Sequence, residues 1–248
     1  MQKTDNFSGE IRAPEENAIG VERRSVILPR ALPFAVFIAF IGVDELAGFL
    51  SRYGIVHLDE YFPFVLYPLK ALAAAAVLLF FRSDYYEIKL RDLSKLRDST
   101  ISVLAGLALF VAWINLDYSL GSQGQGFNPT IIKSSHTMWL IISIRLTGAA
   151  VIVPIMEELF WRSFLIRYII SKDFERIPIG AFTWGSFLLC SILFGFEHQL
   201  IIAGIVAGIV YNLLLYYTKS ISQCILSHAV TNLALGIYVL LTAQWRFW

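Results

Sequence analysis

The chain alternates long apolar runs with short polar connections. A helix needs about 20 apolar residues to cross a hydrocarbon core of about 30 Å. Runs of roughly that length fall at residues 31–50, 60–81, 99–116, 137–170, 179–197, 200–218 and 221–243. Since only helices and closed barrels satisfy their backbone inside lipid, we predict an all-α, polytopic transmembrane bundle of about seven helices, within a range of six to eight.

The polar stretches divide the chain further. Residues 1–30 are polar and lack the early apolar region of a signal peptide, so we expect a flexible tail. Residues 31–136 would hold the N-terminal membrane helices, 137–243 the membrane core with the candidate site, and 244–248 an interfacial aromatic tail. The Gly- and Ser-rich loop 117–136 predicts a mobile connection. Loop 82–98 fits either a basic amphipathic helix on the membrane or a solvated connector.

Basic residues in the connections predict the orientation. With the N-terminus inside, the inner segments carry twelve Lys and Arg residues and the outer segments three. This asymmetry predicts a multi-pass membrane protein with a cytoplasmic N-terminus.

Composition agrees with a membrane protein and excludes some partners. Hydrophobic residues make up 57% of the chain, and the mean hydropathy is +0.64, beyond what a soluble domain tolerates. A net charge of +1 gives no reason to expect nucleic acid as a partner. Cys190 and Cys224 lie in apolar runs without CxxC spacing, which favours packing roles.

Ionisable residues inside the apolar runs are the candidates for function, because charge in a membrane is unfavourable unless it is used or paired. They are Asp44, Glu45, Lys70, Arg145, Glu157, Glu158, Arg162, Glu197, His198 and His228, with Asn232 as a polar neighbour.

The segment VIVPIMEELFWR contains the first candidate constellation. Glu158 and Arg162 are four residues apart and share a helical face, which favours an ion pair. Glu157 is rotated by about 100° from Glu158 and has no such partner, so it suits a general base acting on water. The alternative is that both acids only pair with basic residues on neighbouring helices.

Two histidines and an amide complete the set. His228 and Asn232 are four residues apart on the last helix and form a donor pair suited to an oxyanion, although interhelical hydrogen bonding is the alternative. His198 ends the fifth run. It could share the water with Glu157 or act when protonated, but it could also be an ordinary interfacial residue.

Other chemistries have weaker support. Ser227 directly precedes His228, and on a helix the two point apart, whereas Cys224 and His228 have a usable i, i+4 spacing. Glu157, His198 and His228 could bind zinc, but the HExxH motif is missing. We therefore expect no cofactor, with zinc as the alternative.

Three motifs occur in order: EExxxR at Glu157 to Arg162, FxxxH at Phe194 to His198, and HxxxN at His228 to Asn232. Over residues 137–243 the chain resembles the CPBP family, also called the CAAX protease and bacteriocin-processing or Abi family. The resemblance implies a glutamate-dependent intramembrane endopeptidase, of a kind formerly classed as metalloproteases. Glu157 and His198 would activate water, His228 and Asn232 would bind the oxyanion, and Glu158 with Arg162 would support the first helix of the site.

The C-terminal stretch TNLALGIYVLLTAQWRFW resembles a bacterial branch linked with exosortase and protein-sorting systems. This implies a bacterial inner-membrane location and a membrane-associated protein or peptide as substrate. Two other classes remain open: a non-catalytic scaffold or immunity protein, and a transporter. The transporter is less favoured because no pair of broken helices is evident.

The depth of the candidate residues is a difficulty. In a simple seven-helix arrangement Glu157 lies near one side of the membrane, and His198 ends the next helix on the other side. The fourth run, at 34 residues, would be about 50 Å long, and Pro154 is a natural kink in it. Either this helix is kinked and tilted or the fifth helix is short, and we expect the kink.

Overall fold

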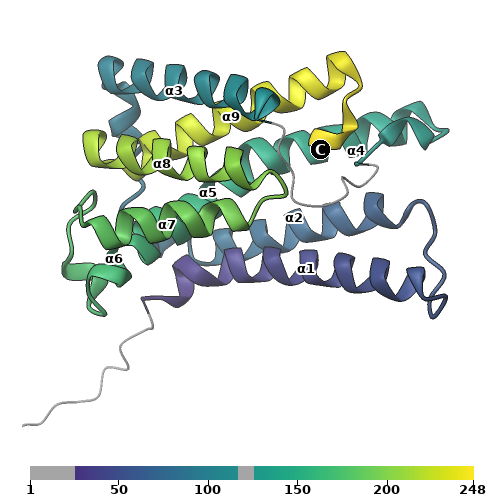
Figure 1. The fold of residues 1–248 in the computed structure, drawn as a ribbon, viewed down its shortest axis with the longest axis horizontal. Coiled ribbons are helices and arrows are strands. Elements are labelled where there is room, and N and C mark those ends of the chain that lie inside the picture. The colour runs from purple at the N-terminus through teal and green to yellow at the C-terminus, as the bar shows by residue number, and fades with distance from the viewer. Residues whose placement is uncertain (1–25, 117–125) are drawn as a thin grey trace, which may run out of the picture.

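The computed structural model describes residues 26–116 and 126–248. These residues form an all-α bundle whose helices run alternately in opposite directions (Figure 1). The helices are α1 (Leu28–Arg52), α2 (Phe62–Phe80), α3 (Leu96–Asn115), α4 (Ser135–Thr147), α5 (Val153–Glu158), α6 (Ile166–Ile170), α7 (Trp184–Phe196), α8 (Ile201–Thr218) and α9 (Ile221–Thr242). The predicted fold class is confirmed.

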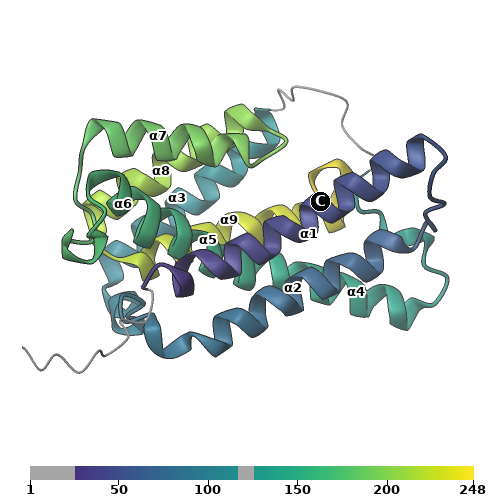
Figure 2. The same cartoon turned by 90° about the horizontal axis from the view of Figure 1, so that it is seen from below.

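Six helical runs are long and apolar enough to cross a membrane. Leucines project from several of them without cover: Leu72, Leu79, Leu104 and Leu241 are each at least 60% exposed. Such apolar surface suits contact with lipid, which is as apolar as the side chains themselves. The protein is therefore an integral membrane protein. Helices α1 and α2 pack against each other, as do α3 and α9 (Figure 2).

The fourth run is one helical segment of 36 residues, Ser135–Ile170, with two wide turns. Its π-helical parts are Gly148–Ile152, just before Pro154, and Leu159–Leu165, just after Glu158. Proline lacks an N–H and its ring crowds the carbonyl four residues earlier, and a wide turn at this point accommodates both effects. The sequence predicted a kink at Pro154, and the structure has a π turn in the preceding residues.

Helix α7 is shorter than predicted and ends inside the bundle. It spans 13 residues, Trp184–Phe196, and follows the N-cap Thr183. Its last turn crosses the start of α8 closely, since a Cβ added to Gly204 would lie 2.9 Å from the Cα of Gly195. His198 therefore follows a short helix that is held against α8. A short fifth helix was the less favoured of our two solutions to the depth difficulty, and it is present.

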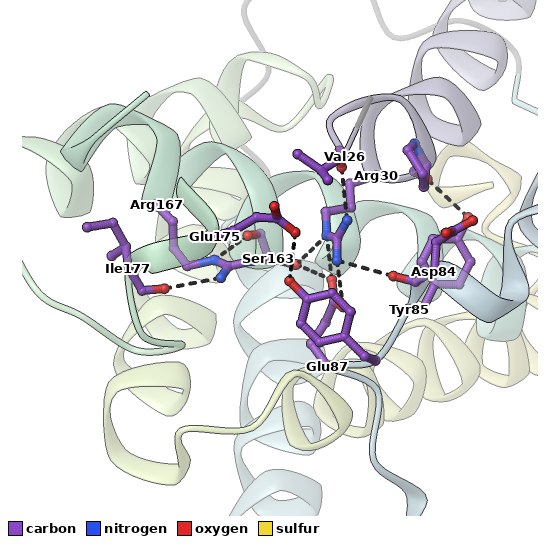
Figure 3. Close-up of polar contacts among 11 residues, drawn as sticks. Val26, Arg30, Asp84, Tyr85, Glu87, Ser163, Arg167, Glu175 and Ile177 are labelled. Carbon is purple, nitrogen blue, oxygen red and sulfur yellow. Dashed lines mark hydrogen bonds and ion pairs between the residues drawn. The ribbon is translucent and has the colours of Figure 1, made fainter. Parts of the chain in front are cut away.

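The connection from 81 to 95 is not the amphipathic helix that was one interpretation of loop 82–98; it is a mostly exposed connector with two buried acids. It contains short 3₁₀ turns at Arg82–Asp84 and Leu90–Ser94, and the side chains of Glu87 and Asp92 are buried in the bundle. Glu87 belongs to a group of hydrogen-bonded residues that we call the Arg30 cluster, consisting of Arg30, Glu87, Ser163 and Arg167 (Figure 3). The burial has a physical cause, because Glu87 supplies the counter-charge to a buried arginine.

Both ends of the described chain are held in the fold rather than free. Helix α1 begins at Leu28, and Arg30 is already buried in it, whereas residues 1–25 of the predicted tail lie outside the described residues. The predicted mobile loop lies partly outside them too, at 117–125. Residues 245–247 form a 3₁₀ turn, and the carbonyl of Trp248 accepts a hydrogen bond from the Phe127 N–H at 3.2 Å.

Candidate active site

A cavity of about 170 Å³ lies among α3, the α4–α6 run, the end of α7, α8 and α9. Its polar lining includes Arg145, Glu157, His198, Tyr211, His228 and Asn232. Four of the six predicted site residues thus face one cavity, although they come from three separate segments of the chain. The other two, Glu158 and Arg162, are fully buried beside it.

Glu158 and Arg162 form the ion pair expected from their spacing. An Nη of Arg162 lies 3.3 Å from a Glu158 carboxylate oxygen. The Arg162 Nε–H also donates to Asn212 Oδ1 at 3.2 Å, and the Asn212 amide donates to Ser191 Oγ at 3.0 Å. The guanidinium lies 4.4 Å from the Phe194 ring centre. Arg162 thereby ties the helix that carries the two glutamates to α7 and α8.

His228 lies between both glutamates. Its Nδ1 is 2.9 Å from a Glu158 carboxylate oxygen, and its Nε2 is 3.9 Å from Glu157 Oε2. The ring stacks on Tyr211 at a centroid distance of 4.9 Å. A carboxylate at Nδ1 fixes the orientation of an imidazole and directs Nε2 to the reacting group. Glu158 therefore orients two side chains, of which the sequence indicated only Arg162.

Asn232 is anchored by a π turn. Its side-chain amide donates to the carbonyl of Ala149 at 2.8 Å, within the turn Gly148–Ile152. A primary amide has two N–H groups, so one remains to donate to a ligand in the cavity. Asn232 lies one helical turn beyond His228 on α9, and both line the cavity as their spacing predicts.

His198 is positioned by its own helix end. Its Nδ1 lies 2.7 Å from the Phe194 carbonyl, so this nitrogen carries the proton and Nε2 is the acceptor. The Trp113 ring packs edge-on against it at 5.2 Å. The structure thus brings His198 to the same cavity as Glu157.

Glu197 is the residue that the sequence analysis left without a role. It accepts a hydrogen bond from the Trp161 indole N–H at 2.8 Å. Ligand atoms of Glu157, Glu197 and His198 all lie within 4.8 Å of one another. The available signal was a carboxylate directly beside a candidate histidine at the end of an apolar run.

These three residues also define how a metal would fit. Carboxylate oxygens and an imidazole nitrogen are suitable ligands for zinc. Of the predicted zinc set, Glu157 and His198 lie in this cluster, whereas the Nδ1 of His228 is engaged by Glu158. The donor set thus fits a divalent cation, with Glu197 in the place expected for His228.

Several buried polar atoms around the cavity have no hydrogen-bond partner within the described part of the chain. They include Glu157 Oε2, Glu158 Oε2, Arg145 Nε and Ser227 Oγ. Such atoms are uncommon in folded proteins and suggest water or ligand binding. Cys224, in contrast, is fully buried near the Tyr211 carbonyl and is absent from the cavity lining, in keeping with a packing role.

Comparison with known protein families agrees with this geometry. The family model for type II CAAX prenyl endopeptidase Rce1-like proteins matches residues 136–234. The matched region runs from the start of α4 into α9 and contains all three motifs. No curated protein and no solved structure matches the chain. Over residues 136–234 the chain is therefore similar to the membrane endopeptidases of the CAAX protease family.

Proposed function

We propose that this protein hydrolyses a peptide bond of a membrane-associated protein or peptide, with Glu157 activating the attacking water. The observation that carries the proposal is the cavity shared by Glu157, His198, His228 and Asn232. A general base needs a carboxylate oxygen free to take a proton, and Glu157 Oε2 has no hydrogen-bond partner among the described residues.

The reaction would proceed through a tetrahedral intermediate. Water lying between Glu157 and the acceptor Nε2 of His198 gives its proton to Glu157, and its oxygen bonds to the scissile carbonyl carbon. The carbonyl oxygen becomes an oxyanion, which the free N–H of Asn232 stabilises. Glu157 then passes its proton to the amide nitrogen as the C–N bond breaks, releasing a carboxylate and an amine.

His228 stabilises the oxyanion only when it carries two protons. Its Nδ1–H is used by Glu158, so Nε2 becomes a donor once a second proton binds there. Glu158 would thus contribute to the oxyanion site by holding His228.

A metal-dependent variant is the second candidate, favoured by the cluster of Glu157, Glu197 and His198. A divalent cation held there would lower the pKa of a bound water to about 7. Metal analysis of the purified protein, followed by dialysis against a chelator, separates the two mechanisms. Under the glutamate mechanism chelation leaves cleavage unchanged, whereas loss of cleavage with rescue by zinc favours the metal.

The location and the partner system are also part of the proposal. We place the protein in a bacterial inner membrane with its N-terminus in the cytoplasm and associate it with an exosortase-type sorting system. In that orientation the cavity would lie on the outer side of α3 and α7, which run away from the end that holds Leu28 and stop well short of the far end of α1 (Figure 1). Labelling of single cysteines placed near Leu28 and near Trp248 tests this orientation.

The deciding experiment compares the membrane proteomes of cells that produce the wild type and Glu157→Gln. Uncleaved precursors should accumulate only with the variant, because an amide cannot accept the proton from water. Glu45→Gln is the matched control, since Glu45 is an exposed carboxylate on α1 outside the cavity. A scaffold or immunity protein predicts no precursors with either variant, and uptake into proteoliposomes would instead support a transporter.

A further inference from the structure

Arg145 is a cation in the cavity wall that the mechanism above does not use. It lies on α4 and lines the same cavity as Glu157 and Asn232. The other arginines inside the bundle, Arg30, Arg162 and Arg167, each donate at least two hydrogen bonds from the guanidinium. Arg145 differs, since its Nε–H is buried without a partner in the described structure.

Aromatic rings, rather than acids, surround the Arg145 guanidinium. Its central carbon lies 4.2 Å from the Tyr67 ring centre, 4.7 Å from that of Phe127 and 5.9 Å from that of Trp248. The Tyr67 hydroxyl donates to the Arg145 backbone carbonyl at 3.1 Å. Ring faces hold a guanidinium by cation–π attraction while leaving its N–H groups for other acceptors.

Arg145 has no ion-pair partner among the described residues. The carboxylate of Asp44 acts on Arg145 and on Lys70 only from beyond ion-pair distance. A second cation, Lys70, lies over the same Tyr67 ring at 5.2 Å. An unpaired cation inside a membrane protein is unfavourable and marks a binding or conduction site unless an anion neutralises it. This wall of the cavity is therefore suited to an anionic ligand.

Arg145 and Glu157 lie on one line along the cavity. Arg145, Ala149, Val153 and Glu157 recur at every fourth position and all line it. Twelve residues at a helical rise of at most about 1.5 Å each, with the π turn Gly148–Ile152 between them, place the two Cα atoms at most about 18 Å apart. An extended peptide covers about 3.3 Å per residue, so that distance corresponds to roughly four to six residues.

We propose that Arg145 is a substrate-binding residue that pairs with a carboxylate of the peptide, about four to six residues from the bond presented to Glu157. The inference rests on the proposed function. The carboxylate comes either from a peptide C-terminus or from an Asp or Glu side chain. A planar guanidinium binds either one through two parallel hydrogen bonds.

The test uses the full-length protein in lipid nanodiscs and a library of ten-residue peptides. Each peptide is made with a free C-terminus and as the C-terminal amide, and each internal Asp or Glu is also replaced by Asn or Gln. Hydrolysis is followed by mass spectrometry. Binding is followed separately by tryptophan fluorescence, because Trp113 and Trp248 line the cavity.

The wild type should bind carboxylate peptides at least about tenfold more tightly than their neutral counterparts, the effect of losing one charge-assisted hydrogen-bonded pair. In Arg145→Gln this ratio should fall to about one, and Arg145→Lys should give an intermediate ratio. Lys70→Gln is the matched control, since it removes a neighbouring cation that does not line the cavity, and it should keep the wild-type ratio.

The outcomes test the carboxylate site separately from the proposed endopeptidase activity. Sensitivity to amidation identifies the terminal carboxylate, and sensitivity to Asp→Asn or Glu→Gln identifies a side chain. Binding that depends on Arg145 without hydrolysis of any peptide would refute the endopeptidase and keep the carboxylate site. The inference is overturned if the wild type shows no charge preference or if Arg145→Gln retains it, even where peptides are cleaved.

Discussion

The Arg30 cluster and the cavity lined by Glu157 are both polar sites inside the bundle, but their polar atoms are hydrogen-bonded to different degrees. Arg30 donates to Glu87 at 2.7 and 2.9 Å and to the Val26 and Asp84 carbonyls (Figure 3). None of the unpartnered buried atoms of the described residues belongs to this cluster, whereas Glu157, Glu158 and Arg145 each have one. Complete pairing is typical of a structural site, and incomplete pairing of a site that awaits a ligand.

One stretch of helix serves both regions. In the π segment Leu159–Leu165, Arg162 points to Glu158 and Asn212 on the cavity side. The next residue, Ser163, donates to Glu87 and accepts from Arg30 and Arg167. The paired region thus holds the helix that presents the glutamates, which predicts opposite responses to substitution in the two regions.

The largest effect on stability should come from breaking the paired region. Arg30→Met leaves Glu87 buried without its counter-charge, which should lower the free energy of unfolding by about 3–5 kcal/mol. Thermal unfolding in detergent measures the change. Replacing both partners, as Arg30→Met with Glu87→Leu, should recover much of the loss. A single variant as stable as the wild type would contradict the assigned role of the cluster.

Asn232→Ala should act on the reaction rather than on the fold. Under the proposed mechanism the variant lacks one oxyanion donor, which should raise the barrier by about 2.7–4 kcal/mol, equivalent to about 10²–10³ in kcat. Among residues 26–116 and 126–248, the side-chain hydrogen bond that the variant loses is the one to the Ala149 carbonyl. Cleavage rates and unfolding temperatures of the variant should be measured together. If the loss of activity matches the loss of folded protein, Asn232 has a structural role.

A smaller effect on stability is expected at Asp92 when the pH is lowered. Asp92 accepts hydrogen bonds from Ser220 and Lys95, which, against the opposing effect of burial, hold the pKa of its carboxyl below the usual value. Since the pKa is lowered by folding, this stabilisation is complete at neutral pH and is lost as the pH falls through the folded pKa. Asp92→Asn should therefore weaken the acid dependence of stability measured below about pH 4. An unchanged pH profile in the variant would contradict this.

The smallest effect on stability is expected at Arg145. Arg145→Met removes a cation without breaking an ion pair. The free energy of unfolding should therefore change by less than about 1 kcal/mol, or it should increase. Arg30→Met and Arg145→Met make the same replacement in the Arg30 cluster and in the cavity wall, so the difference between their effects compares the two regions directly. A loss as large as that of Arg30→Met would mean that Arg145 has a structural partner.

The sequence predicted those parts of the site that lie on single helices. The Glu158–Arg162 pair and the shared face of His228 and Asn232 follow from a spacing of four residues. The contact of His228 with Glu158 spans 70 positions, and that of Arg30 with Glu87 spans 57. Such contacts depend on how helices pack, which apolar periodicity does not specify. Glu197 was missed for the same reason, because its neighbour Trp161 lies 36 positions away.

The π turn at Gly148–Ile152 absorbs one additional residue in the helix that carries Glu157, with backbone bonds to the fifth residue instead of the fourth. Because the widened turn takes up that residue, its removal would restore regular α-helical bonding with little rotation of Glu157 relative to α4. The turn also contains the Ala149 carbonyl that accepts the hydrogen bond from Asn232. A one-residue deletion in this stretch would therefore disturb the anchor of Asn232 while leaving the direction of Glu157 nearly unchanged.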